Sequence, residues 1–172
     1  MKLDIGSQIT RKDIIRYINY AIVAFLLIVI QLTVLDFISL ANITPDLLII
    51  LCVWIALKEG QFRALFAGFL IGFVFDLVSI DVIGTNALTK TVVAFFAGLF
   101  FVENEDYKII GSYKFILIVL GASLIHNLIY LFFYLKLSEA SYMVFFIKYG
   151  LASALYTTVM ALFPMLFRIR RK

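Results

Sequence analysis

Long apolar segments separated by short polar ones are the feature that most constrains this chain. The first of them, Tyr17–Leu35, has 19 residues without a charge. An apolar helix of about 20 residues is the length needed to cross the hydrocarbon core of a bilayer, which is about 30 Å thick. The chain is 64% hydrophobic and 15% charged, whereas soluble domains have about 45–50% and about 25%. Lipid must therefore surround much of the folded chain.

The spacing of these segments predicts an all-α membrane protein, a bundle of six transmembrane helices that forms one integral membrane domain over residues 1–172. The first segment is longer than the apolar region of a signal peptide and lacks a small-residue cleavage site, so we expect it to remain as the first helix. The expected helices are residues 17–35, 45–57, 62–80, 86–102, 113–135 and 142–167.

Basic residues predict how the bundle is oriented. The amino-terminal tail, the loops after the second and fourth helices, and the carboxy-terminal tail carry four, two, two and four Lys or Arg residues. The other side holds Lys90, Lys136 and Lys148. Because loops rich in Lys and Arg stay in the cytoplasm, both ends are predicted to be cytoplasmic. The net charge of +4 then belongs to membrane boundaries, so we expect contact with membrane lipid and no nucleic-acid partner.

Two helix starts carry residues typical of caps and turns. Thr44 is predicted to cap the second helix, with Pro45 at the first helical position and Asp46 in the first turn, near the positive end of the helix dipole. Gly84 and Asn86 are predicted to form the turn before the fourth helix and its start. Both starts lie on the side opposite the basic loops.

The second helix is unusually short. Residues 45–57 span about 20 Å at about 1.5 Å per residue, less than the hydrocarbon core of about 30 Å. One interpretation is that the helix begins inside the membrane and that residues 37–44 dip inward, where protein or water must cover their backbone. The other is a single long helix from Phe37 that is kinked at Pro45. Both interpretations stay open from the sequence.

A stripe of small and polar residues runs along the third helix. Gly68, Gly72 and Asp76 are four residues apart, and Ser79 follows three residues later. Small residues at this spacing let another helix backbone approach closely. The stripe therefore predicts helix packing, either within the chain or against a helix of a partner.

Asp76 is costly inside a membrane and needs a partner. It could serve an ion or proton site, but a buried pair or a helix-cap acceptor is the favoured interpretation. Asp76 lies four residues before the expected end of its helix, and Lys90 lies four residues after the expected start of the next one. At about 1.5 Å per residue, both are about 6 Å below the outer helix ends. We therefore predict an ion pair between them; Lys90 could instead extend to the headgroups or to Asp81.

His126 and Asn127 form a polar pair near the middle of the fifth expected helix. Hydrogen bonding between helices is the favoured interpretation, and a pocket for a ligand or a partner is the alternative. One histidine cannot hold a haem between two histidines, and no Cys, Asp or Glu lies at metal-ligand spacing from it. The chain also lacks a nucleophile elbow, a phosphate-binding glycine loop and a zinc-protease motif. We expect no metal, no cofactor and no enzymatic activity.

The most specific motif lies in the block between Thr44 and Gly98. Its parts are Pro45-Asp46-Leu47-Leu48, Ala56-Leu57-Lys58-Glu59-Gly60, the segment from Gly68 to Ser79, Gly84-Thr85-Asn86-Ala87-Leu88, and Ala97-Gly98. In this block the chain resembles the MreD family of rod shape-determining proteins, which shows a proline before a short second helix and a GF-x-x-G-x-x-x-D-x-x-S third helix. Lys90 is a departure, because an apolar residue is expected there.

The resemblance implies a fold similar to the substrate-binding subunits of energy-coupling-factor vitamin transporters. It further implies a non-enzymatic scaffold of the bacterial cell-elongation machinery, located in the cytoplasmic (inner) membrane and supporting peptidoglycan synthesis. The implied partner is an MreC-like single-span membrane protein, and through it an MreB-like filament and peptidoglycan synthases. A homodimer is left open.

The alternative function is a solute-binding membrane subunit of a vitamin-type transporter. The short second helix and the polar residues of the fifth would suit an outward cavity. Such subunits usually dock their coupling partner through an alanine-rich face of the first helix. Here Ala21 and Ala24 are three residues apart among bulky side chains, which argues against transport.

Overall fold

The computed structural model describes residues 11–34, 39, 43–79, 82–135 and 142–169, which form helices and turns with no strand among them. The predicted all-α class is therefore confirmed. The helices are α1 (Arg11–Thr33), α2 (Leu47–Glu59), α3 (Gln61–Val78), α4 (Thr85–Gly98), α5 (Asp106–Ile110), α6 (Tyr113–Leu135), α7 (Tyr142–Phe145), a π-helical stretch (Phe146–Gly150), α8 (Leu151–Met160) and α9 (Leu162–Ile169).

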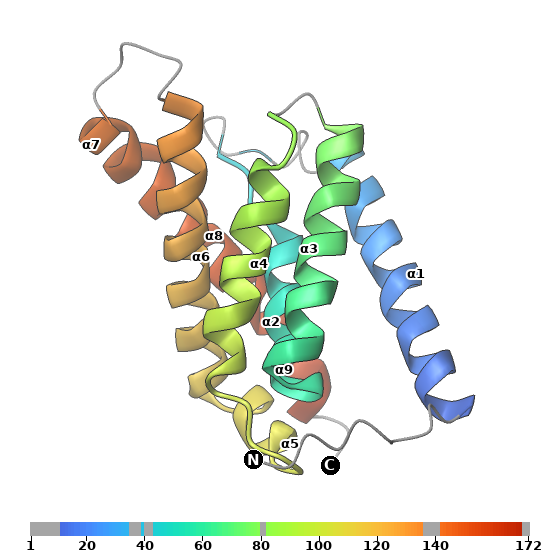
Figure 1. The fold of residues 1–172 in the computed structure, drawn as a ribbon. Coiled ribbons are helices and arrows are strands. Elements are labelled where there is room, and N and C mark those ends of the chain that lie inside the picture. Colours follow the sequence, from blue (N-terminus) through green and yellow to red (C-terminus); the bar gives the residue numbers. More distant parts are fainter. Residues whose placement is uncertain (1–10, 35–38, 40–42, 80–81, 136–141, 170–172) are drawn as a thin grey trace.

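The long helices run side by side, and the first and last described helices begin and end at the same end of the bundle (Figure 1). We call this the terminal end. Four segments are long and apolar enough to cross a membrane: α1, α3, most of α6, and the segment from Met143 to Phe167. The shorter α2 and α4 lie between α1 and α6 (Figure 1). Ten of the thirteen residues of α2 are buried, so this helix is the centre of the bundle.

The start of α2 is capped by Asp46 and is bound by α8. Asp46 is the N-cap, and its Oδ1 accepts hydrogen bonds from the backbone N–H groups of Leu48 and Ile49. Thr157 and Ser153 of α8 bind the backbone just before the helix: Thr157 Oγ1 accepts from Asp46 N–H at 2.9 Å, and Ser153 Oγ donates to the Thr44 carbonyl at 3.0 Å.

Two sequence predictions about α2 are therefore corrected. Thr44 is not the N-cap and Pro45 is not the first helical residue, because the cap lies two residues later, at Asp46. A long helix kinked at Pro45 is also wrong, since residues 43–46 are not helical. The inward-dipping interpretation fits residues 43–46, whose backbone is covered by α8; the rest of the 37–44 stretch lies, apart from Ser39, outside the described residues.

The α3 and α4 helices pack with their backbones in close approach along their length. Gly60, with a φ of 84°, turns the chain between α2 and α3 within one residue. A Cβ atom on Gly68 would lie 2.7 Å from the Lys90 carbonyl oxygen, and one on Gly98 would lie 2.6 Å from Gln61 Cα. A Cβ on Gly72 would collide with the Asn86 carbonyl oxygen. The glycine face of α3 is therefore occupied by α4, and helix packing there is within the chain.

The last predicted helix, residues 142–167, is present but interrupted. Asn127 of α6 donates a hydrogen bond of 2.8 Å from its side-chain nitrogen to the Gly150 carbonyl, inside the π-helical stretch. A side chain that binds a backbone carbonyl in this way replaces a helical partner, which is one cause of such irregular turns. A second break falls at Ala161, three residues before Pro164, which has no N–H to donate.

Glycine substitutions on two helices test the close packing of α3 and α4. Gly72→Ala forces the two backbones apart, and overpacking of this kind costs about 1–3 kcal/mol of unfolding free energy. Gly121→Ala in α6 is the matched control, because a Cβ there has nothing within 4 Å. Thermal unfolding in detergent should show a lower midpoint for Gly72→Ala and no loss for Gly121→Ala. Equal midpoints for the two variants would contradict the packing.

Candidate functional site

A buried ion pair lies at the centre of the bundle. Lys90 of α4 is fully buried, and its Nζ lies 2.9 Å from Asp46 Oδ2 at the start of α2. The same ammonium donates a 2.7 Å hydrogen bond to Asn86 Oδ1, one turn earlier on α4. It also lies 5.2 Å from the centroid of the Phe75 ring, which adds a cation–π contact. Lys90 is therefore held by α2, α3 and its own helix.

Polar residues of α6 and α8 surround this ion pair. His126 Nε2 lies 3.4 Å from Asp46 Oδ2, and the His126 ring stacks on Tyr130 with centroids 5.7 Å apart. Thr157 of α8 accepts the Asp46 N–H. Among the described residues, His126 Nδ1 and the hydroxyl of Ser123, one turn earlier on α6, are buried without a hydrogen-bond partner. Asp46 thus joins four helices through one side chain and its backbone.

Asp76 of α3 binds the start of α4. Its carboxylate accepts hydrogen bonds from the backbone N–H groups of Gly84, Asn86 and Ala87 at 3.0, 3.1 and 2.9 Å. Gly84 is the N-cap residue, has a φ of 95° and offers no side chain of its own. Asp76, on the neighbouring helix α3, supplies the acceptor that Gly84 lacks. This is the helix-cap role that was one of the interpretations of Asp76 from the sequence. Ser79 follows as the C-cap residue of α3.

The predicted ion pair between Asp76 and Lys90 is wrong. Both residues are buried at the α3–α4 interface, as their spacing suggested. The carboxylate of Asp76 is taken up by three N–H groups at the positive end of α4. The ammonium of Lys90 turns to Asp46 instead, because the short α2 brings its N-cap to the same depth.

The geometry of the cluster is that of a structural element. Asp46, Asp76 and Lys90 each have charged or strongly polar partners within hydrogen-bond distance, and Asn127 is bound to the Gly150 carbonyl. Among the residues that the structure describes, no group of three or more His, Cys, Asp or Glu side chains could hold a metal ion. The charged side chains of the cluster therefore bind partners within the chain, whereas the Ser123 hydroxyl and His126 Nδ1 have none among the described residues.

A second charged cluster lies near the terminal end, and the sequence analysis missed it. Glu59, at the end of α2, is buried and accepts a 2.9 Å hydrogen bond from the hydroxyl of Tyr20. Its carboxylate also lies 3.1 Å from Arg16 Nε and 3.4 Å from Arg63. The signal available was an acidic residue closing a helix whose other residues are almost all apolar. These contacts fasten α1 to α2 and α3.

An open groove lies beside this cluster, with α1 and α3 as its walls and α2 as its floor. Its volume is about 520 Å³. Only two residues of α1, Ala24 and Ile28, are buried. Small residues from both walls, Ala21 and Ala67, contribute to the lining, with Phe66 and Leu70 beside them. We call this surface the α1–α3 groove.

Comparison with known proteins identifies the chain. A family model described as rod shape-determining protein MreD matches residues 12–103, just over half of the sequence. The chain belongs to the MreD family. This membership assigns it to rod-shape determination and to the membrane proteins of the MreBCD shape machinery. No curated protein and no solved structure matches the chain, so a likeness to energy-coupling-factor transporter subunits stays a prediction.

The part that matches the MreD family contains most of the features described above. Asp46, Asp76, Lys90 and the three glycines of the α3–α4 interface lie within it, as do both walls of the α1–α3 groove. His126, Asn127 and Thr157 lie outside it. The family segment therefore carries both members of the central ion pair.

A double-mutant cycle tests the central ion pair. Asp46→Asn keeps a capping oxygen but leaves Lys90 without its counter-charge, and Lys90→Met leaves the carboxylate alone. Breaking a buried pair on one side costs about 3–5 kcal/mol of unfolding free energy. We expect each single variant to lose about this much and the double variant to recover part of it, measured by unfolding in mixed micelles.

The control cycle uses the exposed pair between Glu105 and Lys108, which are 2.6 Å apart. Exposed pairs contribute about 0.2–1 kcal/mol, so Glu105→Gln and Lys108→Met should show little coupling. Strict additivity of the two changes at Asp46 and Lys90 would mean that these residues do not interact.

Proposed function

We propose that the chain is a non-enzymatic scaffold of the bacterial cell-elongation machinery. It is a single multi-pass domain of the cytoplasmic membrane, holds an MreC-like single-span protein, and through that partner supports peptidoglycan synthesis near an MreB-like filament. The observation that carries the proposal is the match of residues 12–103 to the MreD family. The ion pair between Asp46 and Lys90 and the helix cap made by Asp76 support it, because these charges are held by partners within the chain.

In the proposed topology the chain crosses the membrane six times, with both ends in the cytoplasm. The described ends of α1 and α9 at one end of the bundle fit an even number of crossings (Figure 1). Arg16, Arg63 and Lys114 lie in the parts of α1, α3 and α6 closest to that terminal end, as expected for a cytoplasmic surface. The short α2 and α4 can cross because their neighbours shield their ends from lipid.

The α1–α3 groove is the proposed docking surface for the membrane span of the partner. The glycine face of α3 cannot serve, because α4 already covers it. The α1–α3 groove is open, has three alanines (Ala21, Ala24 and Ala67) among larger side chains in its lining, and lies wholly within the segment that matches the family. Small residues let another helix approach closely. A partner common to members of the family would bind a surface built from the residues that match the family model.

Cysteine labelling tests the topology. Glu103→Cys, in the loop after α4, should react with a membrane-impermeant thiol reagent only from the cytoplasmic side. Ile83→Cys, in the exposed turn before α4, should react only from outside. The native Cys52 is buried and serves as the unreactive background. Labelling of both positions from the same side would overturn the six-crossing arrangement.

Co-purification tests the partner and its surface. The tagged chain should recover an MreC-like protein from native membranes. Ala21→Phe with Ala67→Phe fills the α1–α3 groove, and overpacking of about 1–3 kcal/mol weakens association about fivefold to a hundredfold. Leu155→Phe on the exposed face of α8 is the control and should leave recovery unchanged. Normal recovery by the groove-filling variant at equal protein level would exclude this surface.

A further inference from the structure

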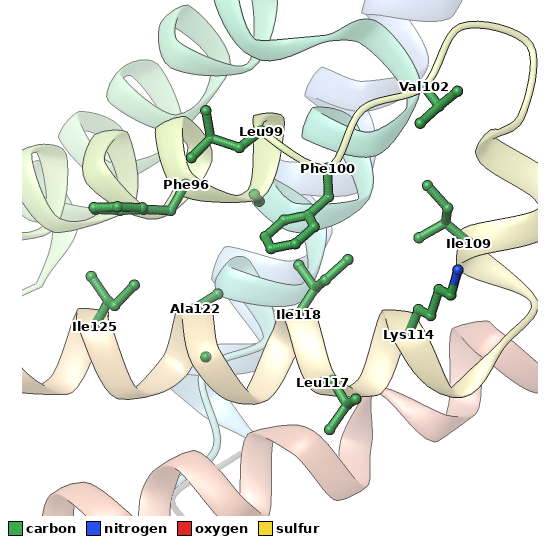
Figure 2. Close-up of a pocket in the computed structure, with 12 residues that line it drawn as sticks. Phe96, Leu99, Phe100, Val102, Ile109, Lys114, Leu117, Ile118, Ala122 and Ile125 are labelled. Carbon is green, nitrogen blue, oxygen red and sulfur yellow. The ribbon is translucent and has the colours of Figure 1, made fainter.

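A second groove lies between α4 and α6, on the other side of α4 from α3. Its walls are Phe96 of α4 with Leu99 and Phe100 just after that helix, and Ile118 and Ile125 on α6. The side chains of Phe100 and Ile118 face one another across the gap (Figure 2). The volume is about 730 Å³, within the range of about 300–1,000 Å³ that is usual for sites of small ligands. We call it the α4–α6 groove.

The floor of the α4–α6 groove is open because α6 carries small residues there. Gly121 and Ala122 line it, and a Cβ atom on Gly121 would have nothing within 4 Å. The walls are partly exposed; Phe100, for example, is 54% exposed. Since the surrounding solvent is a bilayer, the material available to fill this space is apolar.

The length of the groove matches that of a lipid acyl chain. Lys114 and Ile125, which mark its two ends on α6, are eleven residues apart, or about 16 Å at about 1.5 Å per residue. Half of a hydrocarbon core of about 30 Å is about 15 Å. The groove therefore spans about one leaflet, which is the length of a lipid acyl chain.

The charge of the groove lies at the correct end for a lipid headgroup. Lys114 is the one charged residue of the lining, and its amine extends from α6 toward the gap near Ile109 (Figure 2). Lys114 takes part in none of the ion pairs among the described residues. Glu105, in the loop between α4 and α5, is held by Lys108 at 2.6 Å. The amine of Lys114 is thus available to a phosphate at the membrane boundary.

We propose that the α4–α6 groove binds an anionic phospholipid, with its phosphate at Lys114 and one acyl chain along α6 as far as Ile125. In the proposed topology the lipid belongs to the cytoplasmic leaflet, where anionic headgroups attract basic residues. The inference is independent of the partner proposed for the α1–α3 groove. It adds a specific lipid ligand to a surface that the family assignment leaves unexplained.

The test uses the full-length chain in mild detergent with matched amounts of phosphatidylglycerol or phosphatidylethanolamine, and counts retained lipid by native mass spectrometry. The wild type should retain phosphatidylglycerol in preference to phosphatidylethanolamine. Gly121→Leu fills the groove without meeting a protein atom at Cβ, and Lys114→Gln removes its charge. Each should reduce retained phosphatidylglycerol by about fivefold or more, and added phosphatidylglycerol should raise the unfolding temperature of the wild type but not of the variants.

Two controls separate this site from general effects. Lys12→Gln removes a charge from the exposed start of α1, and Val159→Leu adds bulk to the exposed face of α8; both should retain lipid as the wild type does. Equal retention of the two lipids by the wild type would overturn the proposal. So would unchanged retention in Lys114→Gln and Gly121→Leu, or a photo-crosslinker at Leu117 that captures a second copy or another protein in place of lipid.

Discussion

The buried ammonium of Lys90 sets the arrangement of the central helices. In a bilayer no water can solvate this charge if its partners move away, so α2 must present Asp46 at the depth at which α4 presents Lys90. This requirement explains why α2 begins inside the bundle and why the hydroxyls of Ser153 and Thr157 on α8 cover the backbone before it. Separating any one of these helices would expose a charge or an unpaired backbone group to lipid.

Close packing of α3 and α4 makes the central arrangement possible. The glycine contacts bring the two backbones together, and this proximity lets the carboxylate of Asp76 reach three N–H groups at the start of α4. With that end satisfied, α4 holds Asn86 and Lys90 in the orientation that meets α2. At the terminal end, Glu59 performs a similar task by linking α1 to α2 and α3. The bundle is thus joined at two depths.

Hydropathy and small-residue spacing predicted the helices well, because both follow from local sequence. The bounds of α6 were predicted as they are found, since this segment is apolar over most of its length. The partner of Lys90 could not be predicted, because helix spacing points only to the neighbouring helix, whereas Asp46 comes from 44 residues earlier in the chain. The cap of α2 was misplaced by two residues, although Asp46 makes it locally, with the N–H groups of Leu48 and Ile49. The bond from the Asp46 N–H to Thr157, 111 residues away, could not be predicted. The role of Glu59 was not predicted because its partner Tyr20 lies 39 residues earlier in the chain.

The interior charges hold the bundle together, and function lies on its surfaces. Complementation of cell shape tests this claim most directly, in rod-shaped bacteria depleted of their own copy and supplied with the Asp46→Asn, Lys90→Met double variant at the wild-type membrane level. Cells of normal width should return, because the pair is removed together and no unpaired charge remains. Round cells, despite normal level and normal recovery of the partner, would show that the charges act in a process of their own and not only in holding the bundle together.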